Sequence, residues 1–372
     1  MRLLDRYLFR ELLTPFACCL GGFLVLWLAT ELVGEFDELQ ARRLTAADIA
    51  GYYAARVPGY LLIALPVSLL LAMLYALTRH ARWNEVVAMR GAGWSLWRIG
   101  APYFATGLLL SGVAFALNEF LVPDANERAE AVLRRRTDRD DEAARDWREK
   151  LNFHSAGGGR VWTIERFHVP TAAMVGPHIT WPGPTGEREE LIAARAGWED
   201  GAWVFERALR LTYPPGSAVP EQFATNRLVV TAFPETPELI RSEVKISRIL
   251  GSVREVRKAQ LSMREILDYR RLHGALNPKD DRWLATKFHE ALAGGWTSLV
   301  VVFLALPLGA GSGRRGVFLG VASSIFICFA YFVAAQFALA FGTGGHLPPW
   351  LAAWLPNAAF TALGVALILR AR

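Results

Sequence analysis

Six long apolar stretches divide the chain into two groups of three, separated by a polar block from Asp124 to Thr286. A helix that crosses a bilayer needs about 20 mostly apolar residues. Each stretch has that length, and none carries Arg or Lys near its centre, where insertion costs about 2.5–3.5 kcal/mol. The pattern therefore predicts six transmembrane helices, at Leu12–Val33, Val57–Thr78, Ile99–Val122, Phe288–Ala310, Val317–Phe341 and Trp350–Leu369.

The polar block changes period along its length. Ala125–Lys150 is rich in Ala, Arg, Glu and Asp, which is typical of a solvated helix. Apolar and polar residues then alternate, as in Arg160–Glu165, and Gly197–Trp203 places an Asp-Gly pair between two aromatic-bearing strands. Helical spacing returns from Ser262 to Leu276, with Glu265 at the capping-box position. Short strands with regular turns predict a sandwich or jelly roll.

The predicted fold class is a membrane protein of six transmembrane α-helices (3+3) with an inserted all-β, jelly-roll-like domain. Residues 1–123 form the first three spans, with a short loop helix at 83–90. Residues 124–286 form the β-domain with its flanking helices, and residues 287–372 form the last three spans.

Arginine placement predicts the orientation in the membrane. Hydrophobic residues make up 53% of the 372 and charged residues 20%, as lipid-embedded helices require. With a cytoplasmic N-terminus, the inner segments hold eleven arginines and the short outer loops hold three. Both termini are then cytoplasmic and the β-domain periplasmic, and the basic pI of 9.4 reflects topology rather than a nucleic-acid partner. The inner arginines are Arg2, Arg6, Arg10, Arg79, Arg82, Arg90, Arg98, Arg314, Arg315, Arg370 and Arg372, and the outer ones are Arg42, Arg43 and Arg56.

Catalytic motifs are missing from the sequence. There is no Gly-x-x-x-x-Gly-Lys-Ser/Thr loop for ATP and no Gly-x-Ser-x-Gly elbow. His289-Glu290 lacks the second histidine of a zinc helix, since Ala293 stands there, and an interfacial polar pair is the simpler interpretation. Cys18, Cys19 and Cys328 all lie in apolar stretches, so no disulfide framework holds the polar block. We expect no catalytic residue, metal or cofactor in this chain.

The longest inner loop contains a short amphipathic helix. It ends at Gly91 and Gly93, a natural C-terminal stop. Such a helix can fill a groove on a partner protein. It can equally lie in the lipid interface, anchored by Trp83, Trp94 and Trp97, and spacing alone leaves both interpretations open. Its apolar residues are Trp83, Val86, Val87 and Met89, with Glu85 and Arg90 beside them.

Several motifs, taken together and in order, resemble one family. They are Leu4-Asp5-Arg6-Tyr7, Asn84-Glu85-Val86-Val87-Ala88-Met89-Arg90-Gly91-Ala92-Gly93, Gly197–Trp203, Leu306-Pro307-Leu308-Gly309 and Leu347–Asn357. The whole chain resembles the LptF/LptG permease family, which exports lipopolysaccharide from the Gram-negative inner membrane. The first and last motifs resemble LptG more than LptF.

This resemblance implies partners and a mechanism. Such permeases pair as LptF with LptG, bind a dimer of the ATPase LptB, and associate with LptC and LptA-like periplasmic proteins. Lipopolysaccharide enters laterally from the membrane lipid and passes to a periplasmic bridge of jelly rolls, while the partner ATPase uses the ATP. The inner-loop helix matches the family's coupling helix. The ATPase-coupling residues implied are Trp83, Glu85, Val86, Met89, Arg90 and Gly91, with Val86 and Met89 in the ATPase groove and Glu85 pairing with a base at its rim.

The substrate contacts are implied less directly. Family members place basic side chains near the outer ends of the first and third spans to meet lipid A phosphates. Here Glu31 and Glu35 stand at the outer end of the first span, so a basic contact there is missing. The remaining candidates beyond the third span are Arg128, Arg134, Arg135 and Arg136, which a solvated helix face would explain equally well.

Two other function classes remain to be weighed against a permease. A membrane anchor could present the β-domain to envelope proteins, although it would need neither six spans nor an inner docking helix. A membrane-bound periplasmic hydrolase would need an assembled nucleophile or metal set, which the motifs do not supply.

Overall fold

The computed structural model describes residues 3–41, 44–125, 128–129, 132, 146–183, 186–216, 219–252, 256, 259–309 and 314–370. The chain divides into two compact units. The helical unit comprises Met1–Leu133 and Asp281–Arg372, and the β-unit comprises Arg134–Asp280. Apolar helices with an inserted antiparallel sheet confirm the predicted fold class.

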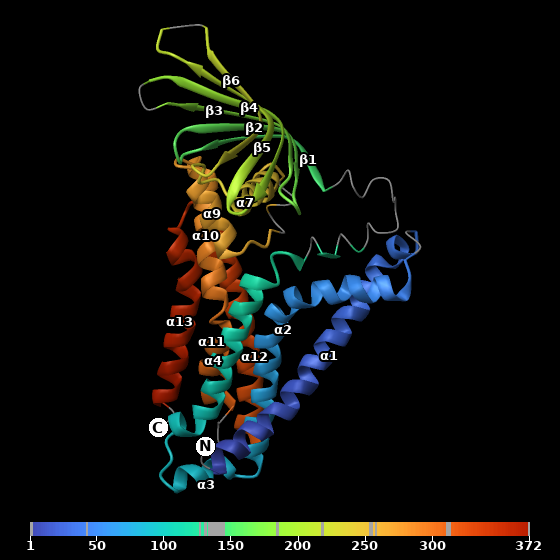
Figure 1. Ribbon diagram of the computed structural model, residues 1–372. Coiled ribbons are helices and arrows are strands. Elements are labelled where there is room, and N and C mark those ends of the chain that lie inside the picture. The colour runs from blue at the N-terminus through green and yellow to red at the C-terminus, as the bar shows by residue number, and fades with distance from the viewer. Residues whose placement is uncertain are drawn as a thin grey trace. The chain divides into compact units, whose positions relative to one another are not determined.

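Five helices of the helical unit are individually long and apolar enough to cross a membrane, counting only the described residues. A sixth span is formed if α10 and α11, which meet at a bend of 48°, are taken together. As far as Gly309, the fourth predicted span, Phe288–Ala310, is thus made of two helices with a break between them in place of one continuous helix. The helices are α1 (Leu3–Ala41), α2 (Ala46–Arg82), α3 (Glu85–Gly91), α4 (Leu96–Phe120), α10 (Pro278–Gly294), α11 (Thr297–Gly309), α12 (Arg314–Thr343) and α13 (Pro349–Arg370) (Figure 1).

Polar side chains stabilise the break between α10 and α11. Asn357 of α13 donates from its Nδ2 to the carbonyl of Ala293, at 2.8 Å. The Tyr331 hydroxyl of α12 donates to Asn357 Oδ1 at 2.7 Å and lies 3.1 Å from Thr297 Oγ1. An interrupted helix within a bilayer needs such partners, because lipid offers none to exposed backbone groups. The sequence pattern missed the break because both halves are apolar.

The helices of this unit differ in how deeply they are buried. The core is built from α2, α4 and α11, with Leu69, Met73 and Val302 among its fully buried residues. Close approach is possible at Gly364 of α13, where a Cβ would lie 2.6 Å from the Phe303 carbonyl oxygen. By contrast, only 6% of the apolar window of α1 and 22% of that of α12 is buried. These two helices expose most of their apolar surface.

The β-unit contains six described strands in one antiparallel sheet with the order β1-β2-β3-β4-β5-β6. Each strand pairs with its neighbours in sequence, so the sheet is a meander (Figure 1). The prediction of a jelly roll is corrected in this respect, since a jelly roll consists of two sheets with Greek-key connections. The strands are β1 (Trp147–Ser155), β2 (Arg160–His168), β3 (Met174–Pro182), β4 (Arg188–Glu199), β5 (Ala202–Tyr213) and β6 (Glu221–Val230).

The Asp-Gly hairpin is confirmed. Trp198 of β4 pairs with Trp203 of β5, and Glu199 pairs with Ala202. The two-residue loop between them has φ of 47° at Asp200 and 81° at Gly201. Positive φ at both central residues is what a type I′ turn requires, and Asp-Gly adopts it at low cost.

Two helices cover the apolar face of the sheet. Ile240 of α7 (Pro237–Leu250) and Leu272 of α9 (Met263–Leu272) belong to the same core as Trp162, Trp203 and Phe205. The sequence analysis missed α7.

Both helices begin at recognisable caps. Thr236 precedes Pro237 in the position of an N-cap, a start signal for α7 that was available in the sequence. The predicted capping box of α9 is confirmed, with Ser262 and Glu265 bonding reciprocally at 2.9 and 3.1 Å. The predicted helix Ala125–Lys150 is wrong at its end, where β1 begins at Trp147, and residues 133–145 lie outside the described part of the chain.

Candidate functional site

Helix α3 occupies the predicted inner loop, between α2 and α4. The chain turns into it through Asn84, which adopts a left-handed φ of 55°. It turns out of it at Gly93, with φ of 87°, where the Gly93 and Trp94 amides bond back to the carbonyls of Arg90 and Met89. Both termini of the chain lie at the same end of the helical unit as α3 (Figure 1).

The four apolar side chains of this segment face in two directions. Val86 is 3% exposed and belongs to the core of the helical unit, and Met89 packs partly against that core. Trp83 is 74% exposed and Val87 is 49% exposed. The structure therefore splits the single apolar face that the sequence suggested. Val86 and Met89 attach α3 to the bundle, whereas Trp83, Val87, Arg90 and Gly91 are exposed.

Glu85 already has partners within the chain. Its Oε2 lies 2.8 Å from His80 Nδ1 and accepts a hydrogen bond from the Tyr7 hydroxyl at 3.1 Å. Because a carboxylate only accepts, Nδ1 carries the hydrogen. The imidazole of His80 is 1% exposed, and the Tyr7 and His80 rings lie 5.7 Å apart. Glu85 was expected to pair with a basic residue on a partner protein. In this structure its carboxylate is already bonded to Tyr7 and His80.

Two ion pairs bind the first turns of α1 to the same region. Asp5 pairs with Arg98 at the start of α4, at 2.9 Å, and Glu11 pairs with Arg79 of α2, at 2.8 Å. The Arg98 guanidinium also lies 5.0 Å from the centre of the Trp94 ring. The end of α1 is thus joined by polar contacts to the helix before α3, to α3 itself and to the helix after it.

Comparison with known proteins identifies the family. The profile of the lipopolysaccharide export system permease LptF/LptG matches residues 6–370, which is nearly the whole chain. The chain belongs to the LptF/LptG family. A search of curated proteins found no match. The family consists of transport permeases rather than enzymes, and its members are multi-pass proteins of the inner membrane, in agreement with the apolar helices described above.

The basic residues expected to meet the lipid of this LptF/LptG member do not form a site among the described residues. Arg128 is exposed and pairs with Asp124, one helical turn away, at 3.2 Å. Arg134, Arg135 and Arg136 lie outside the described residues. The candidate lipid contacts therefore remain predictions.

A second polar cluster, which the sequence analysis missed, joins α1 to α2 far from α3 in the chain. Arg56 Nη1 donates to Glu31 at 3.1 Å, to Glu35 at 2.8 Å and to the Tyr52 hydroxyl at 2.8 Å. The Tyr60 hydroxyl also donates to Glu31, at 3.0 Å. The sequence shows acids at the end of the first span and tyrosines with an arginine at the start of the second. Only the packing of α1 against α2 shows that these side chains are in contact. The two carboxylates here neutralise an internal arginine.

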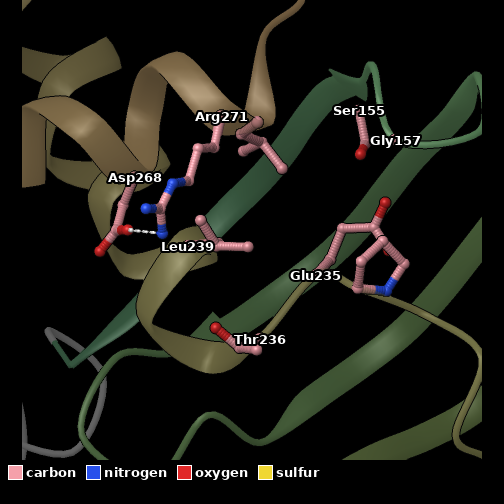
Figure 2. Close-up of a pocket in the computed structure, with 9 residues that line it drawn as sticks. Ser155, Gly157, Glu235, Thr236, Leu239, Asp268 and Arg271 are labelled. Atoms are coloured by element: carbon pink, nitrogen blue, oxygen red, sulfur yellow. Dashed lines mark ion pairs between the residues drawn. The ribbon is translucent and has the colours of Figure 1, made fainter.

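A cavity of about 370 Å³ lies within the β-unit. Figure 2 shows Asp268 and Arg271 of α9 on one side of it and the segment around Glu235 on another. Asp268 lies 3.7 Å from Arg271, and burial raises the pKa of its carboxyl despite that cation. The lining residues are Ser155, Gly157, Pro234, Glu235, Thr236, Leu239, Asp268, Arg271 and Leu272.

The polar residues that line this cavity hold parts of the β-unit together. Glu235 is 1% exposed, and both of its oxygens accept from Arg160 Nε, at 3.0 and 3.2 Å. Its backbone carbonyl accepts from the Trp203 indole at 2.6 Å. These contacts attach the segment before α7 to the sheet. None of the nine lining residues is a histidine that could activate the Ser155 hydroxyl, and the described residues contain no cluster of metal-binding side chains.

Proposed function

We propose that this chain is one permease subunit of an ATP-driven lipopolysaccharide exporter. It extracts lipopolysaccharide from the inner membrane and passes it to a periplasmic bridge, while a separate ATPase subunit hydrolyses the ATP. The observation that carries the proposal is the family match over residues 6–370, together with a short helix that presents apolar side chains to solvent between two spans.

The α3 end of the bundle faces the cytoplasm in this proposal. The arginine excess supports that orientation, because positively charged residues favour the cytoplasmic side in short loops. Arg79, Arg82 and Arg98 flank α3, and Arg90 lies within it. The β-unit, inserted between α4 and α10, is then periplasmic.

The docking surface for an LptB-type ATPase dimer consists of Trp83, Val87, Arg90 and Gly91. Large exposed aromatic and aliphatic side chains are the usual anchors of a protein interface. Val86, Met89 and Glu85 hold the helix from behind, so they contribute to coupling through its position rather than through direct contact.

Helices α1 and α12 are the surfaces that would meet a paralogous LptF or LptG subunit and admit the lipid. Their outward faces remain apolar and exposed, as expected for helices that contact lipid or another bundle. Phe326, Phe329 and Phe337 project from α12, and Val25 and Val33 from α1. A lateral entrance between two such helices fits a substrate that carries acyl chains.

The β-unit would connect to LptC or LptA-like proteins through its outer strands. Among the described strands, β1 and β6 each have one neighbour, so each leaves one edge without a strand partner. Edge strands readily pair with another chain. This arrangement supports a sheet that continues into a periplasmic bridge.

Copurification with the ATPase tests the proposal. Trp83→Asp and Val87→Asp should each lower the amount of LptB-type ATPase that copurifies at least about tenfold, because a charge replaces an apolar anchor. Export of lipopolysaccharide should stop in the same variants. Val219→Asp, at an exposed position of the β-unit, is the matched control and should retain the ATPase.

Two results would redirect the interpretation. Full ATPase binding by both variants would exclude α3 as the docking element. Failure of the unmodified chain to bind any ATPase would favour the alternative, a non-transporting membrane scaffold that presents the β-unit to envelope proteins.

A further inference from the structure

Helix α3 rests on α1 as well as on α2, although α1 is distant in sequence. Tyr7 of α1 and His80 of α2 reach the same carboxylate oxygen of Glu85. Glu85 is the first residue of α3, and 78 positions separate it from Tyr7. A single acid therefore joins three helices at one point.

The contact with His80 is costly to break. His80 is 1% exposed, and its Nε2 has no hydrogen-bond partner within the part of the chain that is described. The bond from Nδ1 to Glu85 is therefore the hydrogen bond that this buried ring makes to the described residues, and losing it would leave a buried polar group unsatisfied. Bonds to an ionised acceptor are also stronger than neutral ones. The imidazole and Glu85 should therefore move together.

Beyond these contacts most of α1 is exposed, up to the Arg56 cluster that attaches its other end to α2. Only 6% of its apolar window is buried, whereas Leu8 and Leu12, in the turns that follow Tyr7, are among the most buried of the described residues. A helix attached near both ends and exposed between them can pivot about the far attachment when the near end is displaced. Displacement of α3 would therefore tilt α1.

We propose that Tyr7 and His80 are positioning residues that fix Glu85 and so transmit the movement of α3 to α1. The inference rests on the proposed function, because it assumes that an ATPase moves α3. It assigns Glu85 a role inside the permease instead of at the rim of the ATPase groove.

The test uses the complete complex, with ATPase and paralogous permease, reconstituted in vesicles that contain lipopolysaccharide. Tyr7→Phe and His80→Leu each remove one donor. Both should retain bound ATPase and ATP hydrolysis within about twofold, but release about tenfold less lipopolysaccharide per ATP hydrolysed. His80→Asn places an amide donor near the position of Nδ1 and should restore much of the yield. Tyr75→Phe, an exposed tyrosine on α2, is the matched control and should match the unmodified chain.

A double-mutant cycle separates a specific contact from general damage. If Tyr7 acts through Glu85, Tyr7→Phe should cause no further loss in a Glu85→Ala background. Unchanged lipid release per ATP in both single variants would overturn the proposal. Loss of bound ATPase in Tyr7→Phe would also overturn it, since the contact would then shape the docking surface. Failure of the proposed function is distinct, because the unmodified complex itself would bind no ATPase or release no lipid.

Discussion

The two polar clusters that join α1 to α2 are built from different chemistry. Near α3, Glu85 accepts from the Tyr7 hydroxyl and from Nδ1 of the His80 ring. In the other cluster, the Arg56 guanidinium faces two carboxylates, those of Glu31 and Glu35. The first is organised by hydrogen bonds and the second by charge.

This difference bears on what each cluster can do. The Arg56 cluster lies entirely within α1 and α2, so it sets the distance between those two helices. The Glu85 cluster includes a helix that carries exposed apolar side chains, so an external contact can displace it. A polar contact transmits movement only where one of its members belongs to an element that a partner can reach.

Removing the cation should have the largest effect on stability. Arg56→Met leaves two carboxylates facing each other and should cost about 2 kcal/mol, less than the roughly 3–5 kcal/mol of a fully buried pair. The reduction reflects side chains that remain 22–28% exposed and therefore partly screened. The midpoint of thermal unfolding in detergent measures it.

Arg128→Ala is the control for that substitution. The Arg128–Asp124 pair is 59% and 51% exposed, so its removal should leave the midpoint nearly unchanged. If both arginine substitutions lowered the unfolding midpoint equally, the Arg56 cluster would stabilise the protein no more than an exposed ion pair does.

Removing one of the two acids should have an intermediate effect. Glu35→Gln abolishes the closer charge beside Arg56 while Glu31 remains, and should cost about 1 kcal/mol. Added salt should lower the unfolding midpoint less in this variant than in the unmodified chain, because less attraction between charges remains to be screened. Glu199→Gln, from an exposed pair with Arg227, should be neutral.

The smallest loss is expected at Glu85. In Glu85→Gln the amide oxygen can still accept from Tyr7 and His80, so stability should fall by no more than about 0.5 kcal/mol. The same unfolding measurement checks it. A loss larger than that of Glu35→Gln would contradict the division between a hydrogen-bonded cluster and a charged one.

The apolar stretches, the alternation of polar and apolar residues and the turn motifs of the sequence predicted the fold class and most of the elements. Apolar stretches of bilayer length correspond to α1, α2, α4, α12 and α13, and Asp200-Gly201 identified its hairpin correctly. These features depend on neighbouring residues, which is why a single sequence reveals them. The break between α10 and α11 was missed because Asn357 and Tyr331, which stabilise it, lie on other helices. The described strands form a meander, in place of the predicted jelly roll. Alternation of polar and apolar residues marks the strands but does not show which strands pair with one another.

The candidate site was predicted only in part. The position and limits of α3 followed from its glycines and its apolar spacing. Which of its side chains face outward did not, because an isolated helix cannot show which face the bundle covers. Val86 was expected at a partner and lies in the core instead.

By itself, the sequence determined that this protein has apolar helices of bilayer length around an inserted β-region, and that it resembles lipopolysaccharide export permeases. Hydrophobic periodicity and local motifs are sufficient for both. Only the tertiary structure decided that Glu85 joins α3 to Tyr7 and His80, and that Glu31 and Glu35 enclose Arg56. Those contacts connect residues up to 78 positions apart, and they form because packing of the helices brings the polar groups together where each needs a partner.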